Sequence, residues 1–124
     1  MKIRVYYEDT DAGGIVYHTN YIKFCERARS EAFFSVGMMP CEDDRSGFIV
    51  KELKCNFLST SKLGDILNVS TEVIKLRGGS TLLLQEIYRD KIKIFSMEIL
   101  LVYVRDGKPT RIPKAHRELL EGYQ

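Results

Sequence analysis

The strongest constraint on the fold is that only one long stretch of the chain has helical periodicity, and strand-like alternation follows it. From about Thr19, apolar residues recur at helical spacing, with charged and polar residues on the opposite side. These apolar positions are Tyr21, Phe24, Cys25, Ala28 and Ala32. The pattern predicts one amphipathic helix of about fifteen residues. Thr19 or Asn20 can cap its start, and Gly37 followed by Pro40 can end it.

Five other stretches have strand character. They cover residues 3–7, 53–57, 67–73, 81–89 and 92–104. Short polar turns at 77–80 and 90–91 join the later strands, as antiparallel hairpins require. A short terminal helix is expected over residues 114–121. This order predicts an α+β domain whose single long helix packs across one antiparallel sheet.

The size and charge of the chain limit its organisation and its partners. Its 124 residues predict one domain over residues 1–124, with one modest core. Nineteen Lys and Arg stand against seventeen Asp and Glu, with the signs interspersed, so no basic stripe predicts a nucleic-acid partner. Because so small a domain closes few deep pockets alone, we expect a homo-oligomer, either a dimer or a tetramer.

The three cysteines, Cys25, Cys41 and Cys55, are odd in number and form no C-x-x-C pair. This spacing argues against a disulfide framework and against a zinc site, and it predicts a reducing, cytoplasmic location. Cys25 and Cys55 fall on apolar faces and are expected to be core residues. No apolar run reaches about eighteen residues, so no membrane insertion is expected.

Residues 7–21 carry the clearest chemical signal, because three acids and two glycines stand just before the start of the expected helix. Asp9 and Asp11 have the D-x-D spacing of a calcium-binding EF-hand loop. The twelfth position of such a loop would be Asn20, where a bidentate Glu is needed. We therefore expect no metal site in this segment.

The start of a helix offers a different chemistry, because its first N–H groups are unpaired and its dipole favours negative charge. Near His18, these groups can polarise a carbonyl as charge grows on its oxygen. Asp11 can then attack the carbonyl or deprotonate an attacking water. The plainer alternatives are that Asp11 caps its own turn and that His18 is a surface or capping residue.

Residues 7–21 closely resemble the opening motif of the 4-hydroxybenzoyl-CoA thioesterase-like hotdog family. The similarity is closest to its YbgC-type branch of bacterial acyl-CoA thioesterases linked to the Tol-Pal envelope system. It extends to residues 24–29, 63–65 and 107–113. The resemblance implies a hotdog fold, in which a five-stranded antiparallel sheet wraps around one long central helix. It also implies dimers joined edge to edge, with active sites at the subunit interface.

The resemblance also implies roles for particular residues. Asp11 corresponds to the catalytic acid, a backbone N–H near His18 to the oxyanion donor, and Tyr7 and His18 to the branch's Tyr and His positions. Residues 59–62 read Ser-Thr-Ser-Lys, where relatives often carry Arg-Pro. For the phosphates of coenzyme A, charge and turn location suggest three cations as contacts, namely Lys62, Arg77 and Arg111.

The implied function is hydrolysis of acyl-CoA thioesters, with acyl carrier protein thioesters as a second substrate class. Coenzyme A is part of the substrate, and no separate cofactor is expected. Two other functions stay open. One is a hotdog dehydratase with His18 as the central base, and the other is a non-catalytic module that binds acyl-CoA or acyl carrier protein.

Overall fold

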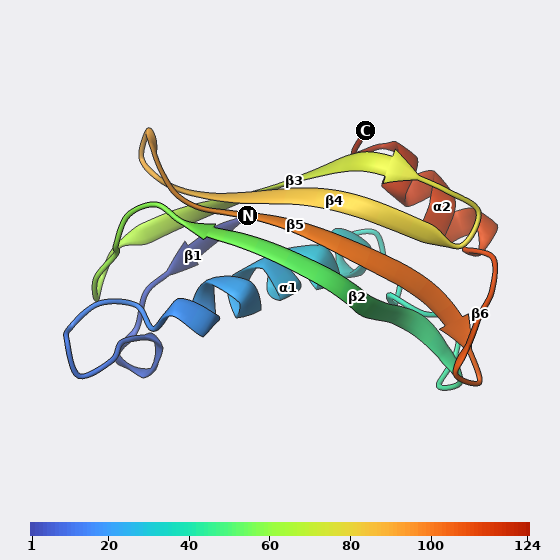
Figure 1. Ribbon diagram of the computed structural model, residues 1–124, viewed down its shortest axis with the longest axis horizontal. Coiled ribbons are helices and arrows are strands. Elements are labelled where there is room, and N and C mark those ends of the chain that lie inside the picture. Colours follow the sequence, from blue (N-terminus) through green and yellow to red (C-terminus); the bar gives the residue numbers. More distant parts are fainter.

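The computed structural model describes residues 1–124, and in it a curved antiparallel sheet wraps around one long helix (Figure 1). The strands are β1 (Lys2–Arg4), β2 (Ser46–Phe57), β3 (Ile66–Leu76), β4 (Ser80–Arg89), β5 (Ile92–Arg105) and β6 (Lys108–Pro109). Their order across the sheet is β1-β3-β4-β5-β2, and the two residues of β6 pair with the end of β5. The helices are α1 (His18–Phe34), α2 (Lys114–Glu121) and the single 3₁₀ turn η1 (Tyr7–Asp9).

The predicted apolar stripe of α1 is the face that packs against the sheet. Tyr21, Phe24, Cys25 and Ala28 are buried, whereas Ala32 is only half-buried. The Tyr21 ring stacks on Phe95 of β5 with 5.4 Å between the ring centroids. Since a lone helix of 17 residues is marginally stable in water, this contact with the sheet stabilises α1.

The two ends of α1 differ in how well the sequence predicted them. The predicted caps at Thr19 and Asn20 are wrong, because the helix begins at His18 and no side chain caps it. Asn20 instead donates its side-chain amide to the carbonyl of Asp9 at 2.8 Å. The stop at Gly37 is confirmed: this residue has φ +74°, and its N–H donates to the Phe34 carbonyl.

The first strand is shorter than predicted, because the chain turns away after Arg4. Tyr7 was expected to end the first strand, yet it begins η1 and is 81% exposed. The cause is local. The Asp9 carboxylate accepts the Tyr6 N–H at 2.9 Å and thereby takes a donor that a longer strand would have used.

Strand β2 is an edge strand, which explains the second difference from the sequence pattern. It pairs only with β5 and begins at Ser46, well before the alternation becomes visible. The alternation predicted a strand with one buried face that carries Leu53 and Phe57, but both residues are exposed. Alternation alone does not distinguish a strand covered by its own subunit from one that is left open at an edge.

The remaining strands and the terminal helix confirm the sequence pattern. Leu67, Val69 and Val73 of β3 are buried, and α2 covers residues 114–121 as expected. In the turn between β3 and β4, a side chain on Gly79 would place its Cβ 2.8 Å from the Thr110 carbonyl oxygen, so the turn needs glycine there. None of the helices combines the length and the apolar character that crossing a membrane requires.

Replacement of Phe24 by alanine tests the contact between the helix and the sheet. The Phe24 ring is 1% exposed, so Phe24→Ala should lower the free energy of unfolding by about 3 to 5 kcal/mol. Phe34 lies on the same helix but is 47% exposed, and Phe34→Ala is the matched control. Denaturant unfolding measures both variants, and similar losses of stability in the two would contradict this packing.

Candidate active site

The segment that runs from η1 to the start of α1 carries three acids, and the second of them, Asp9, fixes its path. The Asp9 side chain is buried and binds the Tyr6 N–H, while its carbonyl accepts the N–H of Tyr17 at 2.9 Å and the Asn20 amide. Asp9 therefore ties the beginning of the loop to the first turn of α1. Its carboxylate is engaged in the local bond to the Tyr6 N–H. Nowhere do three or more His, Cys, Asp or Glu side chains gather as metal ligands.

Asp11 is exposed and lies between η1 and the start of α1. Its Oδ1 accepts the Gly13 N–H at 2.8 Å, its N–H donates to the Ile15 carbonyl, and Gly14 closes the turn at φ +81°. The turn-capping interpretation of Asp11 is therefore correct for one carboxylate oxygen. A carboxylate has further acceptor sites, and its Oδ2 forms no hydrogen bond within the subunit. The turn holds the carboxylate in one orientation and leaves an oxygen free for chemistry.

The start of α1 provides free hydrogen-bond donors. The N–H groups of His18 and Thr19 donate to no backbone carbonyl, and no side chain caps the helix. The exposed imidazole of His18 lies against two rings, with its centroid 4.7 Å from Tyr17 and 5.8 Å from Phe57. Because Phe57 is the last residue of β2, the helix start lies beside one end of the open edge strand.

Residues 61 and 62 hold the other side of the loop. The Ser61 carbonyl accepts the Val16 N–H at 2.9 Å, and Ile15 forms a bridge with Lys62. The buried hydroxyls of Ser61 and Tyr21 share a hydrogen bond of 2.7 Å. The segment that departs from the family's Arg-Pro pattern thus supports the loop and the helix. Lys62 is exposed and close to the loop that carries Asp11.

The other two candidate cations lie elsewhere. Arg77 is in the turn between β3 and β4, at the opposite end of the sheet from the start of α1 (Figure 1). Arg111 lies beside that turn, with its guanidinium near Gly78. Within one subunit, only Lys62 of the three predicted coenzyme A contacts is therefore next to the Asp11 loop.

The cysteines take no part in this arrangement. Cys25 is fully buried in the core, and burial raises the pKa of its thiol to about 12. Cys55 is half-buried, and burial raises the pKa of that thiol too. The core prediction is confirmed for Cys25, whereas Cys55 packs only partly buried against the core. A thiol held in its protonated form is a poor nucleophile.

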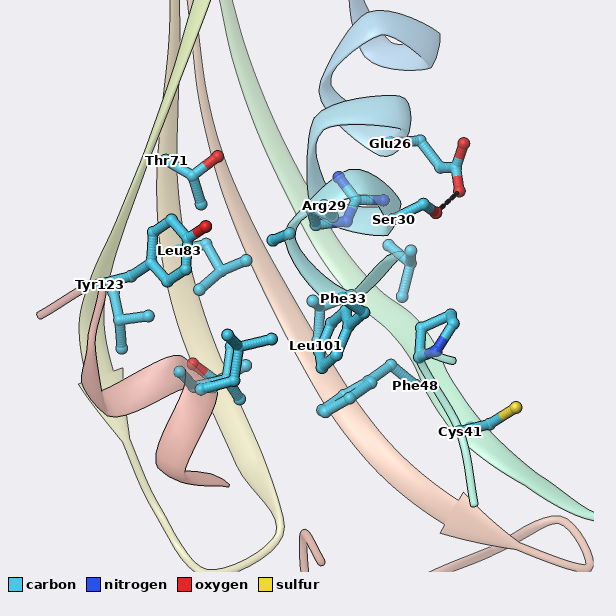
Figure 2. Close-up of a pocket in the computed structure, with 18 of the residues that line it drawn as sticks. Glu26, Arg29, Ser30, Phe33, Cys41, Phe48, Thr71, Leu83, Leu101 and Tyr123 are labelled. Atoms are coloured by element: carbon cyan, nitrogen blue, oxygen red, sulfur yellow. Dashed lines mark hydrogen bonds between the residues drawn. The ribbon is translucent and has the colours of Figure 1, made fainter. Parts of the chain in front are cut away.

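A cavity that the sequence did not predict lies further along α1. It has a volume of about 430 Å³ and separates the second half of α1 from the sheet and from α2 (Figure 2). Its walls come from α1, from residues 40 and 41, from strands β2 to β5 and from the C-terminal segment, and they include Arg29, Val73, Leu83 and Tyr123. None of the predicted site residues lines it. No local sequence signal marks such a space, because its walls meet only in the folded chain.

Comparison with known proteins identifies the family. The family model of the thioesterase superfamily matches residues 13–95. The acyl-CoA thioesterase YbgC of Helicobacter pylori is 40% identical over 131 residues, covering 97% of this chain and 98% of that protein. The acyl-CoA thioester hydrolase YbgC of Escherichia coli O157:H7 is 37% identical over 120 residues, covering 91% and 88%.

A solved structure agrees with these sequence matches. A probable thioesterase from Bartonella henselae superposes with a TM-score of 0.81 at 29% identity, over 91% of this chain and 96% of that one. The chain belongs to the thioesterase superfamily, and the predicted hotdog fold is confirmed. These matches assign no role to single residues, so the roles of all the predicted site residues stay predictions.

Replacing Asp9 and Asp11 one at a time tests whether the first is structural and the second is not. Asp9→Ala leaves the Tyr6 N–H without its partner and should cost about 1 to 3 kcal/mol of stability. Asp11 is exposed, so Asp11→Ala should change stability by only about 0.5 kcal/mol. Thermal unfolding at one pH compares the two variants. A larger loss in Asp11→Ala than in Asp9→Ala would contradict this assignment.

Proposed function

We propose that this protein hydrolyses acyl-CoA thioesters at the start of α1, with Asp11 as the catalytic carboxylate. One observation carries the proposal. The Asp11 carboxylate is exposed and held in place by its turn, and the helix that follows this turn begins with the unpaired N–H groups of His18 and Thr19. Family membership supports it, and so do the names of the YbgC relatives. Acyl carrier protein thioesters are a second substrate class, since their reacting group is the same.

The amides of His18 and Thr19 serve as the oxyanion donors. As the thioester carbonyl is attacked, negative charge grows on its oxygen, which accepts hydrogen bonds from these N–H groups. One preorganised donor of this kind is typically worth about 3 to 4 kcal/mol of barrier. The helix dipole adds to the effect, because its positive end is at the same place.

Asp11 supplies the attacking group by one of two routes. In the first, its free carboxylate oxygen attacks the carbonyl carbon, the coenzyme A thiolate leaves, and water then hydrolyses the resulting anhydride. In the second, Asp11 takes a proton from a water that attacks the carbon directly. Either route yields the carboxylic acid and the free thiol. The bond from Gly13 to Oδ1 keeps the carboxylate from rotating in both.

Three other predicted residues fit around this centre. The His18 ring, held against Tyr17 and Phe57, forms one wall of the reaction site. Tyr7 is exposed at the start of η1, where its hydroxyl can reach a bound ligand. Lys62 reaches the phosphates of coenzyme A from the same subunit. Arg77 and Arg111 lie at the far end of the sheet, and they reach such a ligand only from a partner subunit.

The second subunit docks through β2. This edge strand exposes Ile49, Val50, Leu53 and Phe57, and an open apolar edge is a template for pairing with another strand. Pairing two copies of β2 covers these side chains and continues the sheet. Because His18 contacts Phe57, the same pairing brings the partner next to the helix start. The protein acts in the cytoplasm as such a homodimer, or as a tetramer of two dimers.

The substitution Asp11→Asn tests the catalytic role. Asparagine keeps an oxygen that can accept the Gly13 N–H, but it can neither attack nor accept a proton. We expect kcat to fall by about a hundred- to ten-thousand-fold, with KM little changed. A thiol-release assay with short, long and aromatic acyl-CoA substrates measures both constants. Glu8→Gln removes an exposed neighbouring acid and should leave kcat within a few-fold.

Full activity in Asp11→Asn would overturn the role given to Asp11. Loss of activity in His18→Ala but not in Asp11→Asn would favour the dehydratase alternative. If the protein binds acyl-CoA and neither variant nor wild type releases thiol, it is a binding module.

A charge placed on β2 tests the dimer interface. Leu53 is 41% exposed in the subunit, so Leu53→Lys is tolerated by the monomer but buries an ammonium when two β2 edges pair. The expected result is a shift to monomer in light scattering, with a matching loss of activity. Ile74→Lys, at 42% exposure on β3, is the control. A Leu53→Lys protein that keeps its assembly would exclude this edge as the interface.

A further inference from the structure

The cavity along the second half of α1 has the shape of a ligand site. Its volume of about 430 Å³ lies within the range of small-molecule sites, about 300 to 1,000 Å³. Most of its wall is apolar. The apolar lining includes Phe33, Phe48, Val73, Leu83, Leu101 and Leu120. Figure 2 shows Arg29, Ser30 and Glu26 on the helix side of this space, with Thr71 and Leu83 on the sheet side.

The cavity is separate from the proposed reaction site. Its first lining residue on α1 is Glu26, which is about 12 Å along the helix axis from His18 at about 1.5 Å per residue. Between them, Tyr21 and Phe24 fill the space against the sheet and are at most 3% exposed. A ligand in the cavity therefore does not occupy the helix start of the same subunit.

Arg29 brings an unpaired positive charge to the cavity wall. Its Nη1 donates to Gln85 Oε1 at 2.9 Å, and it forms no ion pair with any carboxylate. A guanidinium has five N–H donors, so most of them lack a protein partner. Glu26, three residues before Arg29 on the helix, accepts the Ser30 hydroxyl at 2.7 Å instead. Burial lowers the pKa of Arg29, which reflects the cost of holding this charge away from water.

The partner of Arg29 is itself fixed in place. Gln85 is completely buried, and its Nε2 donates to the Cys25 carbonyl at 2.9 Å and to the Thr71 hydroxyl at 3.1 Å. These bonds orient Oε1 toward Arg29, so the guanidinium is held at the wall rather than free to swing into solvent. A fixed charge with open donors beside an apolar space is complementary to an anionic head on an apolar body.

We infer that this cavity binds a fatty acid, with the carboxylate on Arg29 and the alkyl chain among the apolar side chains. A guanidinium binds a carboxylate in a bidentate manner, and no acid of the protein occupies that position. The site would hold the free carboxylic acid, the chemical class that thioester hydrolysis releases. Binding there needs neither Asp11 nor the helix-start amides, so it goes beyond the proposed function and is testable apart from it.

The test titrates sodium decanoate into the Asp11→Asn protein and follows backbone amide and methyl resonances by NMR. Saturable shifts of the Val73, Leu83 and Leu101 methyl groups, with the amides of His18 and Thr19 unchanged, support the site. The absence of saturable shifts, or shifts confined to the helix start, would overturn it. Since the Asp11→Asn protein is used, the outcome does not depend on whether Asp11 is catalytic.

Two comparisons test the role of the charge. Arg29→Met keeps the apolar stem but removes the guanidinium, and it should weaken decanoate binding by about tenfold or more, as expected for a lost charge-assisted bond. Arg27→Met, an exposed arginine on the same helix, is the matched control and should bind as before. If Arg29→Met does not fold, the role of the charge is tested by comparing the binding of decanol with that of decanoate to the protein that keeps Arg29. Equal binding of decanol and decanoate would overturn the assignment of Arg29.

Discussion

The burial of one face of α1 in the curved sheet is the contact on which the rest of this structure depends. Phe24 and Cys25 of the helix lie in one core with Phe95 and Met97 of β5, all essentially without exposure. Because the helix is held along this face, its first turn has a fixed position relative to β2 and to the loop before it. The amides at the helix start are therefore preorganised by the core, and they need no cap to hold them.

Two acids in the segment before the helix, Asp9 and Asp11, have different roles. Asp9 is buried and uses its oxygens to join Tyr6, Tyr17 and Asn20, so it fixes the path of the chain. That path leaves Asp11 on the outside of the loop, where its carboxylate is restrained only by the Gly13 N–H. Asp9 thus stabilises the fold, and in our proposal Asp11, two residues later, is the catalytic residue. The difference comes from burial, which the sequence pattern does not display.

Features set by local periodicity could be predicted from the sequence, and features set by distant contacts could not. The face of α1 that carries Phe24, the buried positions of β3 and the turn around Gly79 all follow from spacing and residue type. The helix start was predicted to within one residue, but its capping residues were not, because Asn20 bonds to Asp9 rather than capping the helix. The site motif was found from its resemblance to the family. The cavity was missed, because Arg29 and Gln85 are 56 residues apart and only the fold joins them.

The central claim is that a thioester binds with its carbonyl at the start of α1, beside the side chain at position 11. A crystal structure of the Asp11→Asn protein with an uncleaved acyl-CoA tests this most directly. The account predicts the thioester oxygen about 3 Å from the N–H of His18 or Thr19, with the asparagine facing the carbonyl carbon. A thioester bound elsewhere, with those amides still facing solvent, would contradict it.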